Sequence, residues 1–65
     1  MVDTKRITAR RRELGLTQEA VAERIGIGRA YYSHIETGRQ PDPPLSIAFH
    51  IAEVLQMDVA EMWRE

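Results

Sequence analysis

The stretch TQEAVAERIGIGRAYYSHIETG, residues 17–38, predicts two short helices joined by a tight turn. It opens on Thr17, a good helix N-cap, because its hydroxyl accepts a hydrogen bond from a backbone N–H left free in the first turn. An apolar stripe at helical spacing follows it: Val21, Ala22 and Ile25. Gly26 suits the left-handed position just after a helix, and Gly38 ends the second helix in the same way.

The second of these helices, which begins near Arg29, has two different sides. Tyr32 and Ile35, three residues apart, form the inward side. At about 100° per residue, polar and small residues fall on the opposite side. They are Ala30, Ser33, His34 and Thr37, with Arg29 and Tyr31 at the flanks. Two helices joined by a short glycine-containing turn form the helix-turn-helix arrangement, whose second helix enters the major groove of DNA.

At this point the chain resembles a known family, the lambdoid-repressor and Cro type of helix-turn-helix, or XRE family. The residues that carry the resemblance are Leu14-Gly15-Leu16-Thr17-Gln18, Val21-Ala22, Ile25-Gly26, Ile35-Glu36 and Gly38. It extends over residues 7–63 and implies an all-α, five-helix, lambda-repressor-like domain with the helix-turn-helix at helices two and three. Two residues depart from the family pattern. The family usually has Ser or Thr where this chain has Gly28, and often has Asn where this chain has Thr37. Each departure removes a possible contact to DNA, although glycine is still an acceptable N-cap.

The resemblance also implies which residues contact DNA. We expect base reading from Arg29, Ala30, Ser33 and His34. We expect rim or phosphate contacts from Gln18, Gly28, Tyr31, Thr37, Arg39 and Gln40. In the family, the glutamine that matches Gln18 contacts a phosphate and braces the recognition helix; an ordinary exposed helix residue is the alternative. Arg29 can pair through two hydrogen bonds with guanine, the commonest specific contact.

The first helix is predicted over residues 4–14, after three frayed residues. Its inward stripe includes Arg11, which needs a partner because burial of an unpaired charge is costly. Glu36 is the natural candidate, and the matching family positions form such an internal ion pair. The alternative is that Arg11 extends to solvent. Arg10 and Arg12 flank the stripe as surface groups, and we expect one of them to touch a phosphate.

The last third of the chain begins with a proline-rich loop, residues 39–44, where helix is precluded. A helix is predicted over residues 45–56, with an inward stripe at helical spacing: Leu45, Ala48, Ala52 and Leu55, with Ile51 beside it. Asp58 and Glu61 predict a capping box for a short final helix. We expect a dimer interface at three apolar residues, Phe49, Met62 and Trp63. A role in covering the monomer core is equally open for Trp63.

Length and composition set limits on the class of protein. Sixty-five residues predict one domain, 1–65, and the absence of cysteine excludes disulfides and thiolate metal sites. No stretch has the pattern of a membrane span or a signal peptide, so we expect a cytoplasmic protein, prokaryotic or phage-encoded. His34 and His50 lack metal-site spacing, and neither a phosphate loop nor a nucleophilic triad is present. We therefore expect no cofactor, metal, small-molecule ligand or catalysis.

Charge is divided unevenly along the chain. Residues 1–40 carry eight basic and five acidic groups, whereas residues 41–65 carry one basic and five acidic groups. This asymmetry suggests that one face of the protein binds an anion. The alternative is a solvated surface on which the charges are unevenly distributed by chance. The prediction is a sequence-specific transcriptional regulator, a repressor, that binds double-stranded DNA at a pseudo-palindromic operator as a homodimer. The alternative function is an antitoxin-like or other protein-interaction module on the same fold.

Overall fold

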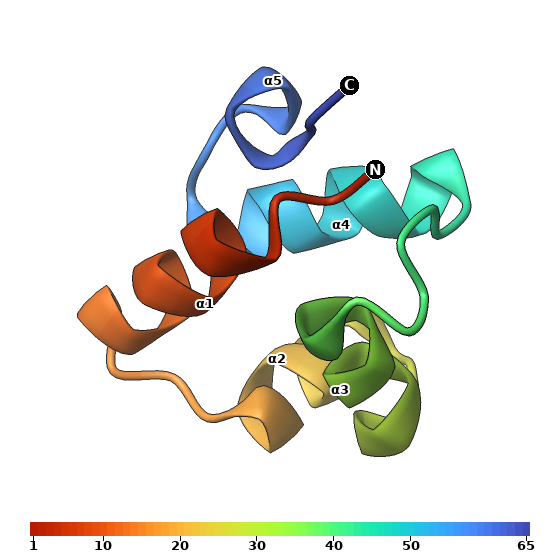
Figure 1. Cartoon of the computed structure of the whole chain (residues 1–65). Helices are drawn as coiled ribbons and strands as arrows, with labels where there is room; N and C mark the ends of the chain where they lie inside the picture. Colours follow the sequence, from red (N-terminus) through yellow and green to blue (C-terminus); the bar gives the residue numbers. More distant parts are fainter.

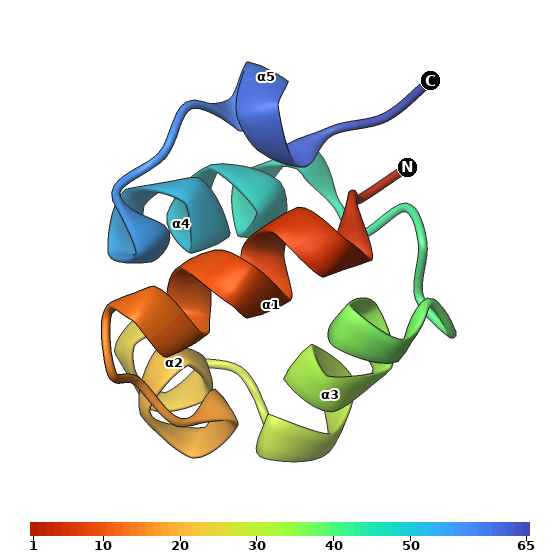
Figure 2. The ribbon, with the colours of Figure 1, turned by 60° about the vertical axis from the view of Figure 1, so that its left-hand side comes forward.

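The computed structural model describes all 65 residues as an all-α fold of five helices. The helices are α1 (Thr4–Glu13), α2 (Gln18–Ile25), α3 (Arg29–Thr37), α4 (Leu45–Leu55) and α5 (Val59–Met62). Figures 1 and 2 show α2 and α3 together at one end of the molecule, α1 and α4 across its middle, and α5 at the other end. The five-helix prediction is confirmed, and the first and fourth helices end one residue earlier than predicted.

The helix-turn-helix forms at the predicted residues, between the N-cap Thr17 and the C-cap Gly38. The Thr17 hydroxyl accepts a hydrogen bond from the Ala20 backbone N–H at 3.0 Å and so caps α2. Gly26 and Gly38 both adopt φ +87°, the left-handed conformation that L side chains disfavour, and they end α2 and α3. Gly38 therefore sets the point at which the recognition helix, α3, ends.

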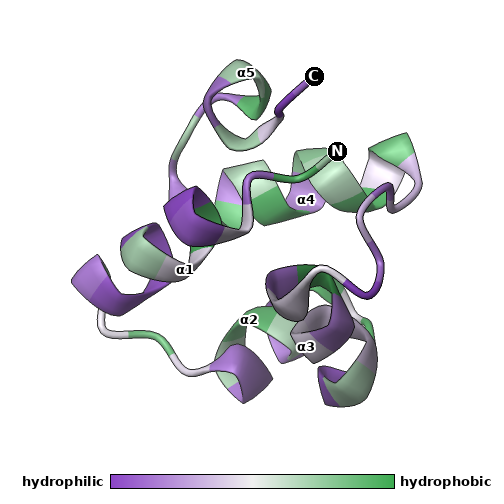
Figure 3. Cartoon of the chain, viewed as in Figure 1, coloured by the Kyte–Doolittle hydropathy of each residue, from purple (hydrophilic) through white to green (hydrophobic).

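One hydrophobic core is shared by all five helices. Its buried residues are Val2, Ile7, Val21, Ala22, Tyr32, Ile35, Ala48, Ile51, Ala52, Leu55 and Met62. Figure 3 shows the contrast between a mainly hydrophobic α4 and a mainly hydrophilic visible face of α1. Full burial of one large aliphatic side chain is worth about 1.5–3 kcal/mol. Because α3 contributes Tyr32 and Ile35 to this core, their burial helps to hold α3 in place.

The expectation of frayed residues at the start of the chain was wrong. Val2 is only 1% exposed and forms an antiparallel bridge with Trp63. Its backbone N–H donates to the Pro41 carbonyl at 2.8 Å, and the Asp3 N–H donates to the Met62 carbonyl at 2.7 Å. The first residues are therefore held by core burial and backbone pairing, and Figures 1 and 2 show the two chain ends near each other.

The predicted inward stripe of the fourth helix is correct except for Leu45, which is 61% exposed. The buried arc of α4 is centred on Ala48, Ile51 and Leu55. Leu45 is the first residue of α4 and lies at the edge of that arc at 100° per residue. None of the five helices has the length and apolar character to cross a membrane.

Candidate nucleic-acid interface

The outward side of α3 gathers the residues predicted to read bases. Together they line one shallow hollow of about 360 Å³: Arg29, Ala30, Ser33 and His34. On the reverse side of the same helix, Tyr32, Ile35 and Glu36 are buried. The predicted division of α3 into an inward and an outward side is therefore confirmed, and the outward side offers a cation, a hydroxyl, an imidazole and a methyl group.

A cluster of hydrogen bonds around Glu36 anchors α3 to the rest of the protein. Arg11 donates twice to the carboxylate, from Nε to Oε2 at 2.7 Å and from Nη2 to Oε1 at 3.1 Å. Oε1 also accepts from Gln18 Nε2 at 3.1 Å and from Thr8 Oγ1 at 3.1 Å. The carboxylate thus ties α3 to both α1 and α2.

The predicted ion pair between Arg11 and Glu36 is present, and Arg11 does not extend to solvent. Only 12% of the Arg11 side chain and 4% of the Glu36 side chain are exposed. The remaining donor of the guanidinium, Nη1, meets the Leu16 carbonyl at 2.9 Å, so the buried charge has partners on both sides. This pairing joins α3 to α1 through two hydrogen bonds.

Electrostatics keep this cluster ionised at neutral pH. Burial on its own raises the pKa of Glu36, but the hydrogen bonds from Arg11 and Gln18 outweigh it, and the net shift is downward. The hydrogen bond to Glu36 raises the pKa of Arg11. Beside them, burial raises the pKa of the Tyr32 phenol, and the neighbouring Glu36 carboxylate raises it further. The Tyr32 hydroxyl is buried and has no partner within hydrogen-bond geometry. The pair is charged, whereas the tyrosine is neutral.

Only part of this cluster is predictable from the sequence. The bracing role that the resemblance implied for Gln18 is visible, because its amide binds a residue of α3. The alternative of an ordinary exposed residue at position 18 is wrong. Thr8 was missed, although it lies three residues before Arg11 and therefore on the same side of α1. That spacing was a signal that could have identified it.

The C-terminal end of α3 is joined to the loop that follows it. The Gln40 backbone N–H donates to the His34 carbonyl at 3.0 Å, and the Gln40 side-chain amide donates to the Tyr31 hydroxyl at 3.4 Å. Thr37 Oγ1 donates to the same His34 carbonyl at 3.4 Å. Arg39 is exposed next to this contact and forms no ion pair, so a free cation stands at the end of the recognition helix.

The three residues predicted for a dimer interface lie in different environments. Phe49 is 53% exposed and is available to a partner. Met62 was predicted wrongly, because it is fully buried: α5 is four residues long and its last side chain fills the core. Trp63 is half-buried against the core and pairs with Val2, which agrees with the alternative of a core-covering role.

Two short capped helices, a left-handed glycine between them and a second helix with a polar outward side define a helix-turn-helix DNA-binding domain. A helix-turn-helix family model matches residues 7–62. The chain belongs to this family, in its XRE type.

Similar proteins agree with this assignment. An uncharacterised HTH-type transcriptional regulator of Methanothermobacter thermautotrophicus is 47% identical over 49 residues, which cover 75% of this chain and 70% of that protein. The N-terminal DNA-binding domain of SinR from Bacillus subtilis has a similar structure, with a TM-score of 0.85 and 29% identity over 95% of this chain and 90% of that one. A solution structure of the same domain of SinR, the master biofilm-regulator, is also similar. Its TM-score is 0.80, with 29% identity over 100% of this chain and 93% of that one.

Proposed function

We propose that this protein is a sequence-specific transcriptional repressor that binds a pseudo-palindromic operator as a homodimer. The observation that carries the proposal is the outward side of α3, where four side chains suited to base contacts share one hollow while the reverse side is buried. A relative is named as a transcriptional regulator, and the similar SinR domain is named as DNA-binding. Repression requires only that the bound domain occupy DNA needed to start transcription.

In this proposal α3 lies in the major groove and reads bases through its first two turns. Arg29 donates two hydrogen bonds to a guanine, and Ala30 packs against a thymine methyl group. Ser33 and His34, on the same hollow, donate to or accept from base edges one turn further along. Each good bidentate base contact is worth about 1–3 kcal/mol of discrimination.

Phosphate contacts would then hold α3 in register from both sides. At the start of α2, Gln18 is placed by its bond to Glu36, and at the end of α3 Arg39 is free of ion pairs. The other proposed rim residues are Gly28, Tyr31, Thr37 and Gln40. Such contacts fix position and orientation but carry no sequence information of their own.

The dimer is proposed because one recognition helix reads too few base pairs to select an operator, and two-fold symmetry doubles that number. The proposed interface is the exposed side of α4 around Phe49, one helical turn after the exposed Leu45. Exposed pairs of large apolar residues favour association.

Selection from a pool of randomised duplexes tests the proposal. The expected result is an enriched inverted repeat whose half-site centres are about 10 base pairs apart, or a multiple of one helical turn. Sedimentation of the protein with the selected duplex should give two protomers per duplex, and a Leu45→Ser/Phe49→Ser variant should lose this stoichiometry while it keeps its helical circular dichroism. A pool that yields no consensus would contradict sequence-specific binding, and one protomer per duplex would contradict the dimer.

A further inference from the structure

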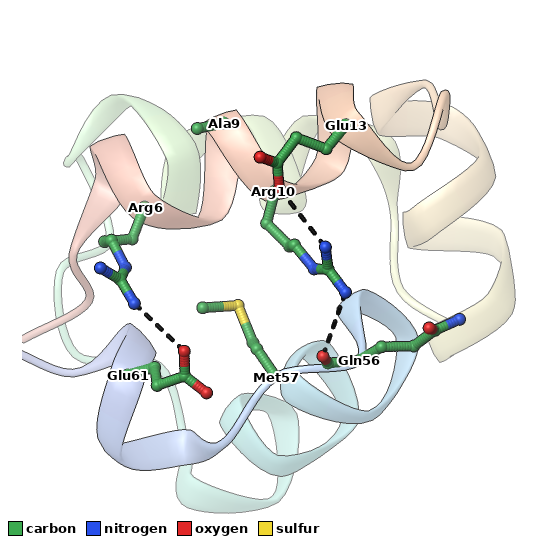
Figure 4. A pocket seen from close by; sticks show the side chains of 7 residues that line it. All are labelled: Arg6, Ala9, Arg10, Glu13, Gln56, Met57 and Glu61. Carbon is green, nitrogen blue, oxygen red and sulfur yellow. Dashed lines mark hydrogen bonds and ion pairs between the residues drawn. The ribbon is translucent and has the colours of Figure 1, made fainter.

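Apart from the buried Arg11, the cations of α1 fall into two groups with opposite surroundings. On one side, Arg6 Nη2 lies 3.1 Å from Glu61 Oε2, and Arg10 Nη1 lies 3.3 Å from Glu13 Oε1. Arg10 also donates to the Leu55 carbonyl at 2.9 Å and so closes the end of α4. Figure 4 shows Arg6, Arg10, Glu13 and Glu61 around a pocket between α1, the end of α4 and α5. Each arginine is directed at one of the two carboxylates.

On the side of α1 toward α3, Lys5 and Arg12 are exposed and form no ion pair. They line a hollow together with Thr4, Thr8, Ala9 and Glu36. The one carboxylate in this hollow, Glu36, is already occupied by four hydrogen bonds, two of which come from Arg11. The two cations therefore remain uncompensated beside the recognition helix.

We propose that Lys5 and Arg12 form a phosphate-binding ridge that extends the DNA contact beyond the helix-turn-helix. The two residues are seven apart on α1, so they lie on one side of the helix about 10 Å apart along its axis. Thr8, between them, is bonded to Glu36 of α3, which fixes the ridge relative to the recognition helix. The inference rests on the proposed function, because the phosphates belong to DNA bound by α3.

The charge pattern favours DNA backbone over other occupants of this ridge. The ridge has two long, flexible cationic side chains and no exposed large apolar side chain. Such a surface suits the regularly spaced phosphates of DNA, which are bound through charge and not through a shape-matched pocket. Arg10 was one of two candidates for a phosphate contact, but its bonds to the end of α4 already occupy it. Arg12 is the candidate that the structure leaves free.

The salt dependence of DNA binding tests the ridge. Fluorescence anisotropy of a labelled mixed-sequence duplex, from about 50 to about 200 mM NaCl, gives the slope of log K against log salt, which changes by about 0.9 per phosphate contact. A Lys5→Gln/Arg12→Gln variant should have a slope smaller by about 1.8 per protomer, so its affinity falls about tenfold less across that range. An Arg6→Gln/Arg64→Gln variant is the matched control. Both arginines are exposed and neither lines the hollow, so the variant loses the same charge and should keep the wild-type slope.

The slopes of these variants distinguish failure of the ridge from failure of the proposed function. An equal reduction of the slope in both double variants would show that only net charge matters and would overturn the ridge. An Arg39→Gln variant should lose about 0.9 of slope through the proposed phosphate contact beside α3. If Arg39→Gln behaves so while Lys5→Gln/Arg12→Gln matches the wild type, the ridge is overturned and the proposed function stands. If the wild type does not bind the duplex, the proposed DNA contact of α3 fails, and the ridge fails with it. If only Arg39→Gln leaves the slope unchanged, the phosphate contact of Arg39 is wrong, and a reduced slope in Lys5→Gln/Arg12→Gln alone still supports the ridge.

Discussion

Removal of the Glu36 carboxylate should be among the most damaging single changes in this protein. A Glu36→Leu variant deletes an acceptor of four hydrogen bonds and leaves Arg11 with the Leu16 carbonyl as its remaining partner. Breaking a buried pair costs about 3–5 kcal/mol. Because 12% of the Arg11 side chain still reaches solvent, we expect the lower end, about 3 kcal/mol. A domain of 65 residues has a total stability of only about 3–10 kcal/mol, so this variant is close to unfolding.

The coupling between the two partners can be measured directly. Urea unfolding of the wild type, Arg11→Met, Glu36→Leu and the double variant, followed by circular dichroism, closes a double-mutant cycle. The double variant should recover about 2 kcal/mol relative to the sum of the single losses, since it buries no unpaired charge. A stabilising osmolyte in all samples keeps the weakest variant measurable, and Glu36→Gln is the isosteric control. Near-additive losses would refute the idea that the pair acts as a unit.

Three further predictions concern groups around this core. Because the pKa of Glu36 is lowered on folding, its contribution to stability is complete above the unfolded value near 4.5 and is lost as pH falls through the lower folded value; urea midpoints should therefore decline below about pH 4.5 in the wild type, and less steeply in Glu36→Gln. Tyr32→Phe should leave the free energy of unfolding within about 1 kcal/mol of the wild type, because the lost hydroxyl has no hydrogen-bond partner, and a larger loss in urea titration would reveal one. Gln56→Gly should raise the melting temperature by several degrees, since Gln56 adopts φ 55° and relief of that conformation is worth about 1 kcal/mol; a lower melting temperature in calorimetry would contradict this.

The features that the sequence could predict are those with local signals. Thr17, Gly26 and Gly38 mark helix ends through interactions within a few residues, and all three act as predicted. The two sides of α3 follow from helical periodicity over nine residues, enough turns for the pattern to be clear. The ion pair of Arg11 and Glu36 was found because an arginine on an apolar stripe requires a partner.

The features that the sequence could not predict depend on contacts between distant residues. A four-residue helix is too short for periodicity, so Met62 looked as available as Phe49, although only Phe49 is exposed. The pairing of Val2 with Trp63 brings together residues that have no shared local pattern. The bond from Arg10 to the Leu55 carbonyl likewise depends on how α1 crosses α4. The tertiary fold also determines which arginine and lysine side chains are paired within the protein and which remain available for a phosphate contact.

The central claim, that α3 reads base pairs, is tested most directly by the affinities of the wild type, Arg29→Ala and Arg39→Ala for the selected operator and its single-base-pair variants. Arg29→Ala should cost about 1–3 kcal/mol on the operator and abolish discrimination at one base pair of each half-site. Arg39→Ala should weaken binding to every duplex by a similar factor and leave discrimination intact. If Arg29→Ala instead weakens all duplexes equally and keeps the wild-type base preferences, α3 does not read sequence in the way proposed.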